Sequence, residues 1–395
     1  MMIRSVKAKA GKVLAVILSV TLLTACSGTE GNEGSTTPTQ SETPTVTDTV
    51  ATATEAPTEK ATEAPTPTEE ADIITDEPDI TEDPSKWTGN TVLSKEDYNM
   101  IDVEYKTKDL ESVIDMTDIT KVYFSEDGIK VEGKKEVRVT NVDGRQIATF
   151  TAKGKYLISG ECSNGQIIVH ADNDKDVRLC LNGLKLTCPD SAVIYGKQCD
   201  KLLITLVGGT ENVLESTKDY IYEDEEKKNP DAVVFTKDDL VINGNGTLTI
   251  KAAKCEGIHS TDSIKIVSGK IVVESGDRGI RAKEFIVVKN ADISITTDSD
   301  AMRTTKDDDD NLGYIVIEGG NIDINTAAEG IQATGNIQIT GGTINIKAEG
   351  KKSNAMKSDK IIYIENASVT VNSENSIKAL SGVVIEDGAV TVKVN

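Results

Sequence analysis

Aromatic residues and histidine are scarce in this chain. Phe, Tyr and Trp make up 4% of its 395 residues, only one of them is Trp, and the two histidines are His170 and His259. Because crystalline cellulose is usually bound on a flat platform of aromatic rings, so few rings argue against that mode of binding. Two histidines and no Cys-x-x-Cys pair also argue against a zinc site.

Long apolar runs are absent as well, apart from a short one near the N-terminus. Val13–Leu23 is too short to span a bilayer, follows four basic residues and ends in Leu23-Thr24-Ala25-Cys26. This ending matches the lipoprotein box of bacteria, in which the cysteine is diacylated and becomes the new N-terminus. We therefore predict that residues 1–26 are a signal peptide, and that a lipid on Cys26 anchors the protein to the outer face of the cell membrane.

Residues 27–86 have very little that could form a core. Thr, Pro, Glu, Ser and Ala dominate, and the hexapeptide at residues 53–58 recurs at residues 61–66. Such a segment stays extended and solvated, and its like charges repel one another. We predict a disordered tether that lets a domain reach through a cell wall, which favours a Gram-positive cell.

The charge balance is acidic. The formal net charge is −22, of which residues 1–26 carry +4 and residues 27–86 carry −13, so residues 87–395 carry −13. Since no basic face dominates, nucleic acid is disfavoured as a partner. The acidity suits an extracellular protein with oxygen ligands for cations, and we expect a monomer.

Cysteine offers no clear framework of disulfides. Five cysteines remain after Cys26, an odd number, at positions 162, 180, 188, 199 and 255. We interpret them as small residues buried in the core.

The last 160 or so residues repeat a unit of two short strands with alternating apolar residues. The first apolar pair of each unit lies at Leu240/Ile242, Ile264/Ile266, Ile286/Val288, Ile315/Ile317, Ile337/Ile339, Ile362/Ile364 and Val383/Ile385. The second pair lies at Leu248/Ile250, Ile271/Val273, Ile293/Ile295, Ile322/Ile324, Ile344/Ile346, Val369/Val371 and Val390/Val392. The steps are mostly 21 to 25 residues, with one of 29. Such a period, with two strands of period 2 per unit, indicates a solenoid of stacked β coils.

These repeats predict an all-β fold, a right-handed parallel β-helix of roughly ten coils that each add about 4.8 Å. Residues 131–395 would form it, and the less regular residues 87–130 would cap its open end, where unpaired strand edges need covering. A left-handed β-helix is the alternative, but the strict hexapeptides that it usually needs are absent.

A third strand follows each second pair, anchored by Ile258, Ile280, Met302, Ile331, Met356 and Ile377. The residue after each anchor should point outward, because side chains alternate along a strand. This gives one column down the coils: His259, Arg281, Arg303, Gln332, Lys357 and Lys378. Salt bridges to neighbouring carboxylates are one interpretation of this column. The other is a strip that binds a hydroxyl-rich or acidic polysaccharide along the axis, since a sugar residue is about as long as one coil step.

Acidic residues gather at the turn before the anchor. We single out Glu256, Asp277, Asp298, Asp300 and Glu329 as candidate metal ligands. Carboxylate oxygens from successive coils could surround Ca²⁺, which takes six to eight oxygen ligands. Calcium is therefore the predicted cofactor.

Several segments together resemble a known family. They are residues 154–160 with 165–169, Val177–Leu186 with its Leu181-Asn182-Gly183-Leu184 turn, Leu202–Leu206, and the turns Glu256-Gly257-Ile258, Asp277-Arg278-Gly279-Ile280 and Glu329-Gly330-Ile331. The chain resembles, over about residues 125–395, clostridial lipoproteins with a carbohydrate-binding, polysaccharide-lyase-like β-helix domain. The resemblance implies a calcium-bearing right-handed β-helix that binds plant cell-wall polysaccharide, including cellulose and acidic pectic chains. The chain departs from the family's Asp-Gly-Ile pattern at residues 256, 278, 354 and 375, which are Glu, Arg, Asn and Asn.

Three functions remain open. The first is a non-catalytic surface protein that binds polygalacturonate or cellulose, and the scarcity of aromatic residues favours the acidic chain. Because the folded part is net negative, binding would then need Ca²⁺ bridges or the Arg and Lys side chains of the column. The second is a calcium-dependent pectate lyase, in which Arg281, Arg303 or Lys357 would remove the sugar's C5 proton beside Asp277, Asp298 and Asp300. The third is a structural or adhesive surface protein. Arginine is a poor base because its pKa is so high, which favours the first function.

Overall fold

The computed structural model describes residues 90–222, 226, 228–387 and 389–393. All of them belong to the unit Thr75–Asn395. The predicted signal peptide, the lipid site Cys26, the whole predicted tether and residues 87–89 of the predicted cap lie outside these residues.

The repeated apolar pairs form strands that stack in register. Ile264 and Ile266 of β15 pair with Ile286 and Val288 of β18, which in turn pair with the next coil. These strands belong to a sheet of 20 described strands: β1 (Thr120–Ser125), β2 (Gly128–Glu132), β5 (Gly154–Cys162), β7 (Asp176–Thr187), β9 (Lys201–Leu206), β10 (Glu211–Ser216), β12 (Asp239–Gly244), β13 (Thr247–Ala252), β15 (Ser263–Ile266), β16 (Lys270–Ser275), β18 (Phe285–Val288), β19 (Ala291–Thr297), β21 (Tyr314–Ile317), β22 (Gly320–Thr326), β24 (Ile337–Ile339), β25 (Gly342–Ala348), β27 (Ile361–Glu365), β28 (Ala367–Ser373), β30 (Gly382–Glu386) and β31 (Ala389–Lys393).

This sheet is really two parallel ladders that share the long strand β7. One ladder continues from β7 through β9 and β12 to β30, and the other continues through β10 and β13 to β31. We call their outer surfaces the first face and the second face.

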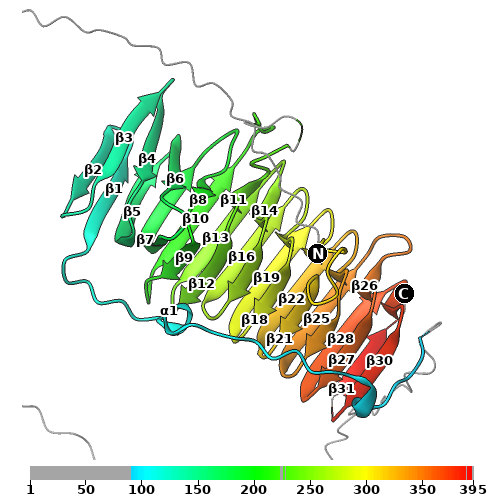
Figure 1. Cartoon of the computed structure of the whole chain (residues 1–395). Helices are drawn as coiled ribbons and strands as arrows, with labels where there is room; N and C mark the ends of the chain where they lie inside the picture. Colours follow the sequence, from blue (N-terminus) through cyan, green and yellow to red (C-terminus); the bar gives the residue numbers. More distant parts are fainter. Residues whose placement is uncertain (1–89, 223–225, 227, 388, 394–395) are drawn as a thin grey trace, which may run out of the picture. The chain divides into compact units, whose positions relative to one another are not determined.

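A separate sheet of 11 described strands forms the third face. Its strands are β3 (Val137–Val142), β4 (Arg145–Phe150), β6 (Gly165–His170), β8 (Ile194–Gln198), β11 (Ala232–Thr236), β14 (Glu256–Ser260), β17 (Ile280–Ala282), β20 (Met302–Thr304), β23 (Ile331–Ala333), β26 (Asn354–Ser358) and β29 (Asn375–Ala379). The three ladders enclose one core, and the predicted parallel β-helix is confirmed (Figure 1).

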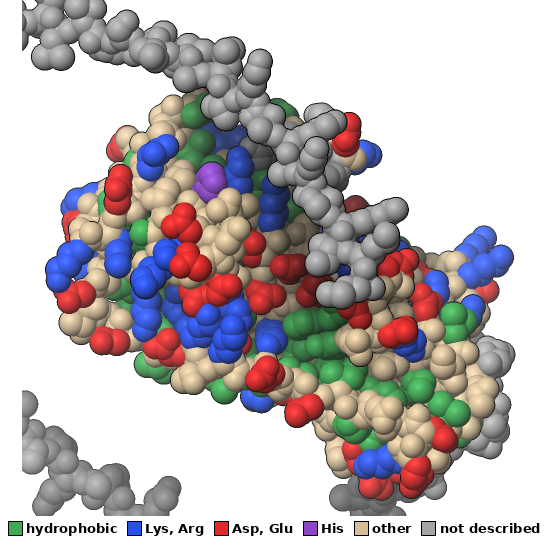
Figure 2. Space-filling model, viewed as in Figure 1, with side chains coloured by type: hydrophobic (Ala, Val, Ile, Leu, Met, Phe, Trp, Pro, Cys, Tyr) green, Lys and Arg blue, Asp and Glu red, His purple; other side chains and the backbone are tan. Residues whose placement is uncertain are grey.

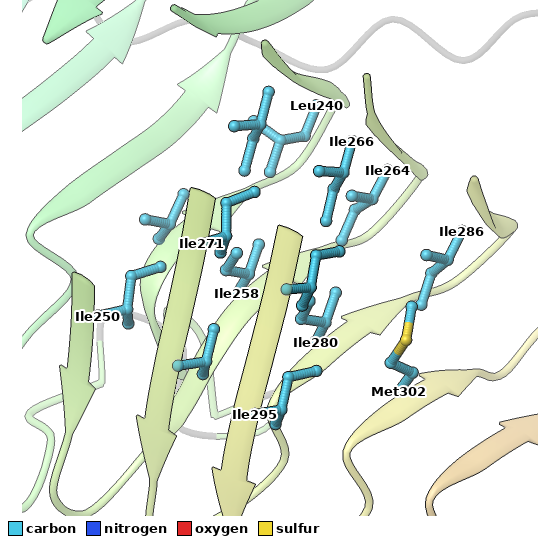
Figure 3. Close-up of a cluster of buried hydrophobic side chains, with 14 of the residues drawn as sticks. Leu240, Ile250, Ile258, Ile264, Ile266, Ile271, Ile280, Ile286, Ile295 and Met302 are labelled. Carbon is cyan, nitrogen blue, oxygen red and sulfur yellow. The ribbon is translucent and has the colours of Figure 1, made fainter. Parts of the chain in front are cut away.

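The core is a stack of β-branched side chains. Ile264, Ile271 and Ile280, from the three faces of one coil, are each fully buried and point toward one another (Figure 3). Identical shapes stack well on a pleated surface, and each such side chain contributes about 1.5–3 kcal/mol by leaving water. The alternation of Ile with polar residues thus fixes which way each strand faces.

The bends between the first and second faces use residues that tolerate positive φ. Gly244, Gly320, Gly342 and Asn366 have positive φ. At Gly320 a Cβ atom would lie 2.2 Å from the carbonyl oxygen of Ala291, so no larger residue fits without a shift of the backbone.

The segment that precedes the coils lies along the first face. We call residues 90–119 the lateral segment; it holds the 3₁₀ turn η2 (Lys95–Asp97) and the short helix α1 (Thr107–Leu110). It runs from the last coil, where Val92 bridges Val383, to the early coils, where Asp109 forms a fully buried ion pair with Lys201 at 3.1 Å (Figure 1). Midway, the side-chain amide of Gln338 exchanges two hydrogen bonds with the backbone of Ile101.

The end of the β-helix is built by the residues that follow. β1 pairs with β2 in an antiparallel hairpin, and β3 pairs antiparallel with β4. We expected residues 87–130 to cap the open end of the β-helix. Residues 90–119 lie on the side of the β-helix instead, and residues 120–130 lie at its end.

All five cysteines of the described part are free and buried, which agrees with their interpretation as core residues. Cys180 differs from the others because it faces outward, beneath Ile114 and Ile119 of the lateral segment. Within the residues that the structure describes, no helix is long and apolar enough to cross a membrane.

Candidate functional site

The column predicted from the third strands is present. His259, Arg281, Arg303, Gln332, Lys357 and Lys378 are register partners on consecutive strands from β14 to β29. Their vertical alignment on the third face is therefore confirmed.

Most of the cations in this column are occupied by carboxylates. Arg281 donates from Nε to Glu256 at 2.7 Å, and Arg303 lies 2.7 Å from Asp300. Lys357 is 3.7 Å from Glu329. Arg281 and Lys357 thus have the cross-coil salt bridges that were one of the two interpretations, whereas Arg303 pairs with Asp300 of its own coil. Lys378 and Gln332 have no side-chain partner among the described residues.

Just before His259 the column holds apolar and aromatic residues, which the sequence analysis did not identify. On β6, β8 and β11, the strands that precede β14 in this sheet, the same column holds Ile168, Tyr195 and Phe235. The ring of His259 meets that of Phe235 edge to face at 5.0 Å, and only 4% of His259 is exposed. His259 was predicted to contact carbohydrate, but in this arrangement a sugar cannot reach it.

The predicted calcium ligands do not converge on one point. In the described part of the chain, the one group of three metal-ligand side chains whose donor atoms lie within 4.8 Å of one another is Asp231, Glu256 and His259. Only Glu256 belongs to the predicted set. Asp298 is exposed at the surface instead, and Asp277 is partly exposed and lies 3.6 Å from Arg278.

A guanidinium group already occupies the position that a cation would take. Arg281 bonds both Glu256 and Asp231, and its Nη2 lies 3.0 Å from Nδ1 of His259. Asp300 is held in the same way by Arg303 and lies 3.8 Å from Arg278. Burial raises the pKa of Glu256, and the charge of Arg281 opposes that rise. The donor set therefore does not fit calcium here, and calcium dependence remains a prediction from the sequence.

The second face carries a regular array of polar side chains that the sequence analysis missed. We call it the polar ladder; it consists of the outward residues of β19, β22, β25 and β28. Its three columns, aligned by strand register, are Asp292/Asn321/Thr343/Ser368, Ser294/Asp323/Asn345/Thr370 and Thr296/Asn325/Lys347/Asn372.

Two adjoining hollows lie on the polar ladder. Their volumes are about 290 and 250 Å³, and Ser294 and Asp323 line both. The larger one also reaches Thr296, Asn325 and Thr370.

The side chains of the polar ladder are only partly bonded to one another. Asn321 donates to Asp292 at 2.7 Å, and Asn345 donates to Asp323 at 2.9 Å. In the described structure Ser294, Thr296, Asn325 and Thr370 make no side-chain hydrogen bond, and Oδ1 of Asn372 is buried without a partner. The ladder thus offers free hydroxyl and amide groups at every coil.

The sequence feature that could have predicted this array is the polar residue that alternates with the apolar residues of the second strand. In Ile293-Ser294-Ile295-Thr296 and its three successors, every outward position holds a short hydroxyl, amide or charged group. Polar outward residues are common on any solvated strand, so the pattern alone does not single out a site.

Comparison with known proteins identifies the family. The family model described as "Carbohydrate-binding domain-containing protein" matches residues 143–395, and the chain belongs to this family. A curated relative of that description from Acetivibrio thermocellus is 30% identical over 220 residues, which cover 55% of this chain and 77% of the relative.

A solved structure shares the fold. It is described as a polysaccharide lyase-like protein from C. thermocellum, as a gadolinium derivative, and is 28% identical with a TM-score of 0.57. The match covers 70% of this chain and all of the solved chain.

Proposed function

We propose that the protein is a lipid-anchored, non-catalytic protein of a bacterial cell surface that holds linear plant cell-wall polysaccharide along its polar ladder. The single observation behind this proposal is the pair of adjoining hollows on aligned strands, whose lining includes Ser294, Thr296, Asn325 and Thr370, side chains that make no hydrogen bond in the described structure. Membership of a carbohydrate-binding family supports it.

The chemistry of the ladder suits hydroxyl groups. Hydroxyl and amide side chains can both donate and accept hydrogen bonds, as sugar hydroxyls do. The rows repeat at the coil step of about 4.8 Å, so an extended chain along the axis can present one sugar to each coil. A rigid β-helix holds these groups in place before the ligand arrives, which lowers the entropy cost of binding.

The charges on the ladder bear on the choice of polymer. It holds Asp292 and Asp323 but also Lys347, so it favours neutral chains such as single cellulose strands. Acidic pectic chains would need cations outside the ladder instead, such as Lys378 of the third face, which is exposed and unpaired in the described structure. Arg281, Arg303 and Lys357 contribute there only if their carboxylate partners release them.

A matched pair of variants tests this proposal. Thr296→Ala/Thr370→Ala removes two hydroxyls of the larger hollow that make no bond within the protein. Each hydrogen bond contributes about 0.5–1.5 kcal/mol. The loss of two should therefore lower the affinity for soluble hydroxyethyl cellulose about 5- to 150-fold, as measured by affinity electrophoresis.

The control is Thr140→Ala/Thr149→Ala, which changes two threonines on β3 and β4 of the third face that also lack side-chain bonds in the structure. It should bind like the unaltered protein. Equal affinity of the ladder variant and this control would refute the proposed location.

A further inference from the structure

A third hollow, of about 450 Å³, lies away from the polar ladder, between the lateral segment and the first coils. Its lining is rich in cations, namely Lys108, Lys135, Lys153, Lys155 and Arg178, against the carboxylates of Glu111, Asp174 and Asp176. Figure 2 shows Lys and Arg side chains gathered over these coils with carboxylates between them. With five cations against three carboxylates, the lining is net positive in a folded part whose charge is −13.

Three of these cations are neutralised within the protein. Lys155 pairs with Glu111 at 2.8 Å, and Lys108 pairs with Asp176. Arg178 is 4% exposed and lies 3.2 Å from Glu111. It also donates to the backbone carbonyl of Lys108, and this fixes the lateral segment as one wall of the hollow.

Two cations and one acceptor are left over. Lys135 and Lys153 are exposed and form no ion pair within the described structure. The ion pair with Lys175 at 2.6 Å lowers the pKa of Asp174, and the charge of Lys153 adds to this effect from beyond ion-pair distance. Oδ1 of Asp176 is buried and has no hydrogen-bond partner. A buried acceptor without a donor is costly, so a ligand that supplied an O–H group there would be favoured.

We propose that this hollow binds a sugar unit that carries an oxyanion. Lys135 and Lys153 would bind the anionic group, and the carboxylate of Asp176, whose side chain is about a third exposed and lines the hollow, would accept a hydrogen bond from a neighbouring hydroxyl. A volume of about 450 Å³ lies within the range of small-ligand pockets and accommodates one or two sugar units. A carboxylate, sulfate or phosphate on the sugar would satisfy the same two ammonium groups.

This site is separate from the polar ladder, which lies on another face and in later coils. Neutral chains would use the ladder and anionic units would use the hollow, so the two proposals fail independently. If the hollow's ligands bind while hydroxyethyl cellulose does not, only the ladder is refuted.

The test is calorimetric titration of the full chain with glucuronate, glucose 6-sulfate and glucose 6-phosphate, with glucose as the neutral reference. We expect at least one anionic sugar to bind and glucose to bind more weakly. Hydrogen bonds to charged groups contribute about 1.5–3 kcal/mol, so each of Lys135→Gln and Lys153→Gln should weaken binding about tenfold or more. The sugar that binds most tightly identifies whether the natural ligand carries a carboxylate, a sulfate or a phosphate.

Lys237→Gln/Lys254→Gln is the matched control, because both lysines are exposed and unpaired in the described structure and neither lines the hollow. It changes the net charge as much as the double variant at Lys135 and Lys153 does, and it should leave binding unchanged. Binding of no anionic sugar, or equal loss in the double variant and this control, would overturn the proposal.

Discussion

Arg281 reaches back one coil and donates from Nε to Oε2 of Glu256 at 2.7 Å. Glu256 is almost completely buried, and Arg278 reaches its other oxygen at 2.9 Å. The two arginines therefore hold a carboxylate that could not otherwise remain charged inside the third face.

Removing Arg281 should expose the cost of that buried charge. In Arg281→Met, Glu256 and Asp231 each lose a partner, and breaking a buried pair typically costs about 3–5 kcal/mol. The free energy of unfolding in urea measures the loss. Arg281→Met/Glu256→Gln should recover a large part of it, because the amide carries no charge. A double variant that is no more stable than the single one would show that the loss comes from packing.

The fold could be predicted from the sequence because its cause is periodic. Ile264, Ile286 and Ile315 recur at the spacing of one coil, and inward β-branched residues determine both the strand and its register. The alignment of Arg281 with Arg303 follows from the same register, so it could be predicted too.

Contacts that do not repeat could not be predicted. The lateral segment touches a different coil at each point, through Tyr98 on Tyr363 and Asp109 on Lys201, and leaves no period in the sequence. Whether Arg281 faces a ligand or Glu256 depends on side-chain conformation, which spacing does not encode.

The buried thiols predict how stability changes at high pH. Burial raises the pKa of Cys180, Cys188 and Cys255 to about 11, from an ordinary value of 9.0. Between those values the unfolded chain releases protons that the folded chain keeps, so stability is present below about pH 9 and falls as the pH rises toward 11. Each thiol contributes about 1.4 kcal/mol per pH unit over this window.

Urea unfolding at pH 8 and pH 10 measures this effect. Cys188→Ala should lose one thiol's share of the slope. With Cys26 replaced by Ser, the native protein should react slowly with a thiol reagent at pH 8. Fast modification of all five remaining thiols would contradict their burial.

Calcium should add little at the network around Glu256. The sequence predicts calcium-dependent binding, but arginines already neutralise Glu256 and Asp300. We therefore expect the same unfolding midpoint in excess calcium and in excess EDTA. A midpoint that calcium raises in the unaltered protein, and that Asp277→Asn/Asp298→Asn abolishes, would place the ion at those two carboxylates instead.

Lyase chemistry needs a base that can lose its proton, and the third face offers few. Arg281 and Arg303 are each held against a carboxylate, which keeps a guanidinium charged. Of the three bases that the sequence suggests, Lys357 remains, at 3.7 Å from Glu329. We expect no rise in ultraviolet absorbance when the protein is incubated with polygalacturonate and calcium across a range of pH, because no unsaturated product forms. Product made by the unaltered protein but not by Lys357→Ala would establish a lyase with Lys357 as its base.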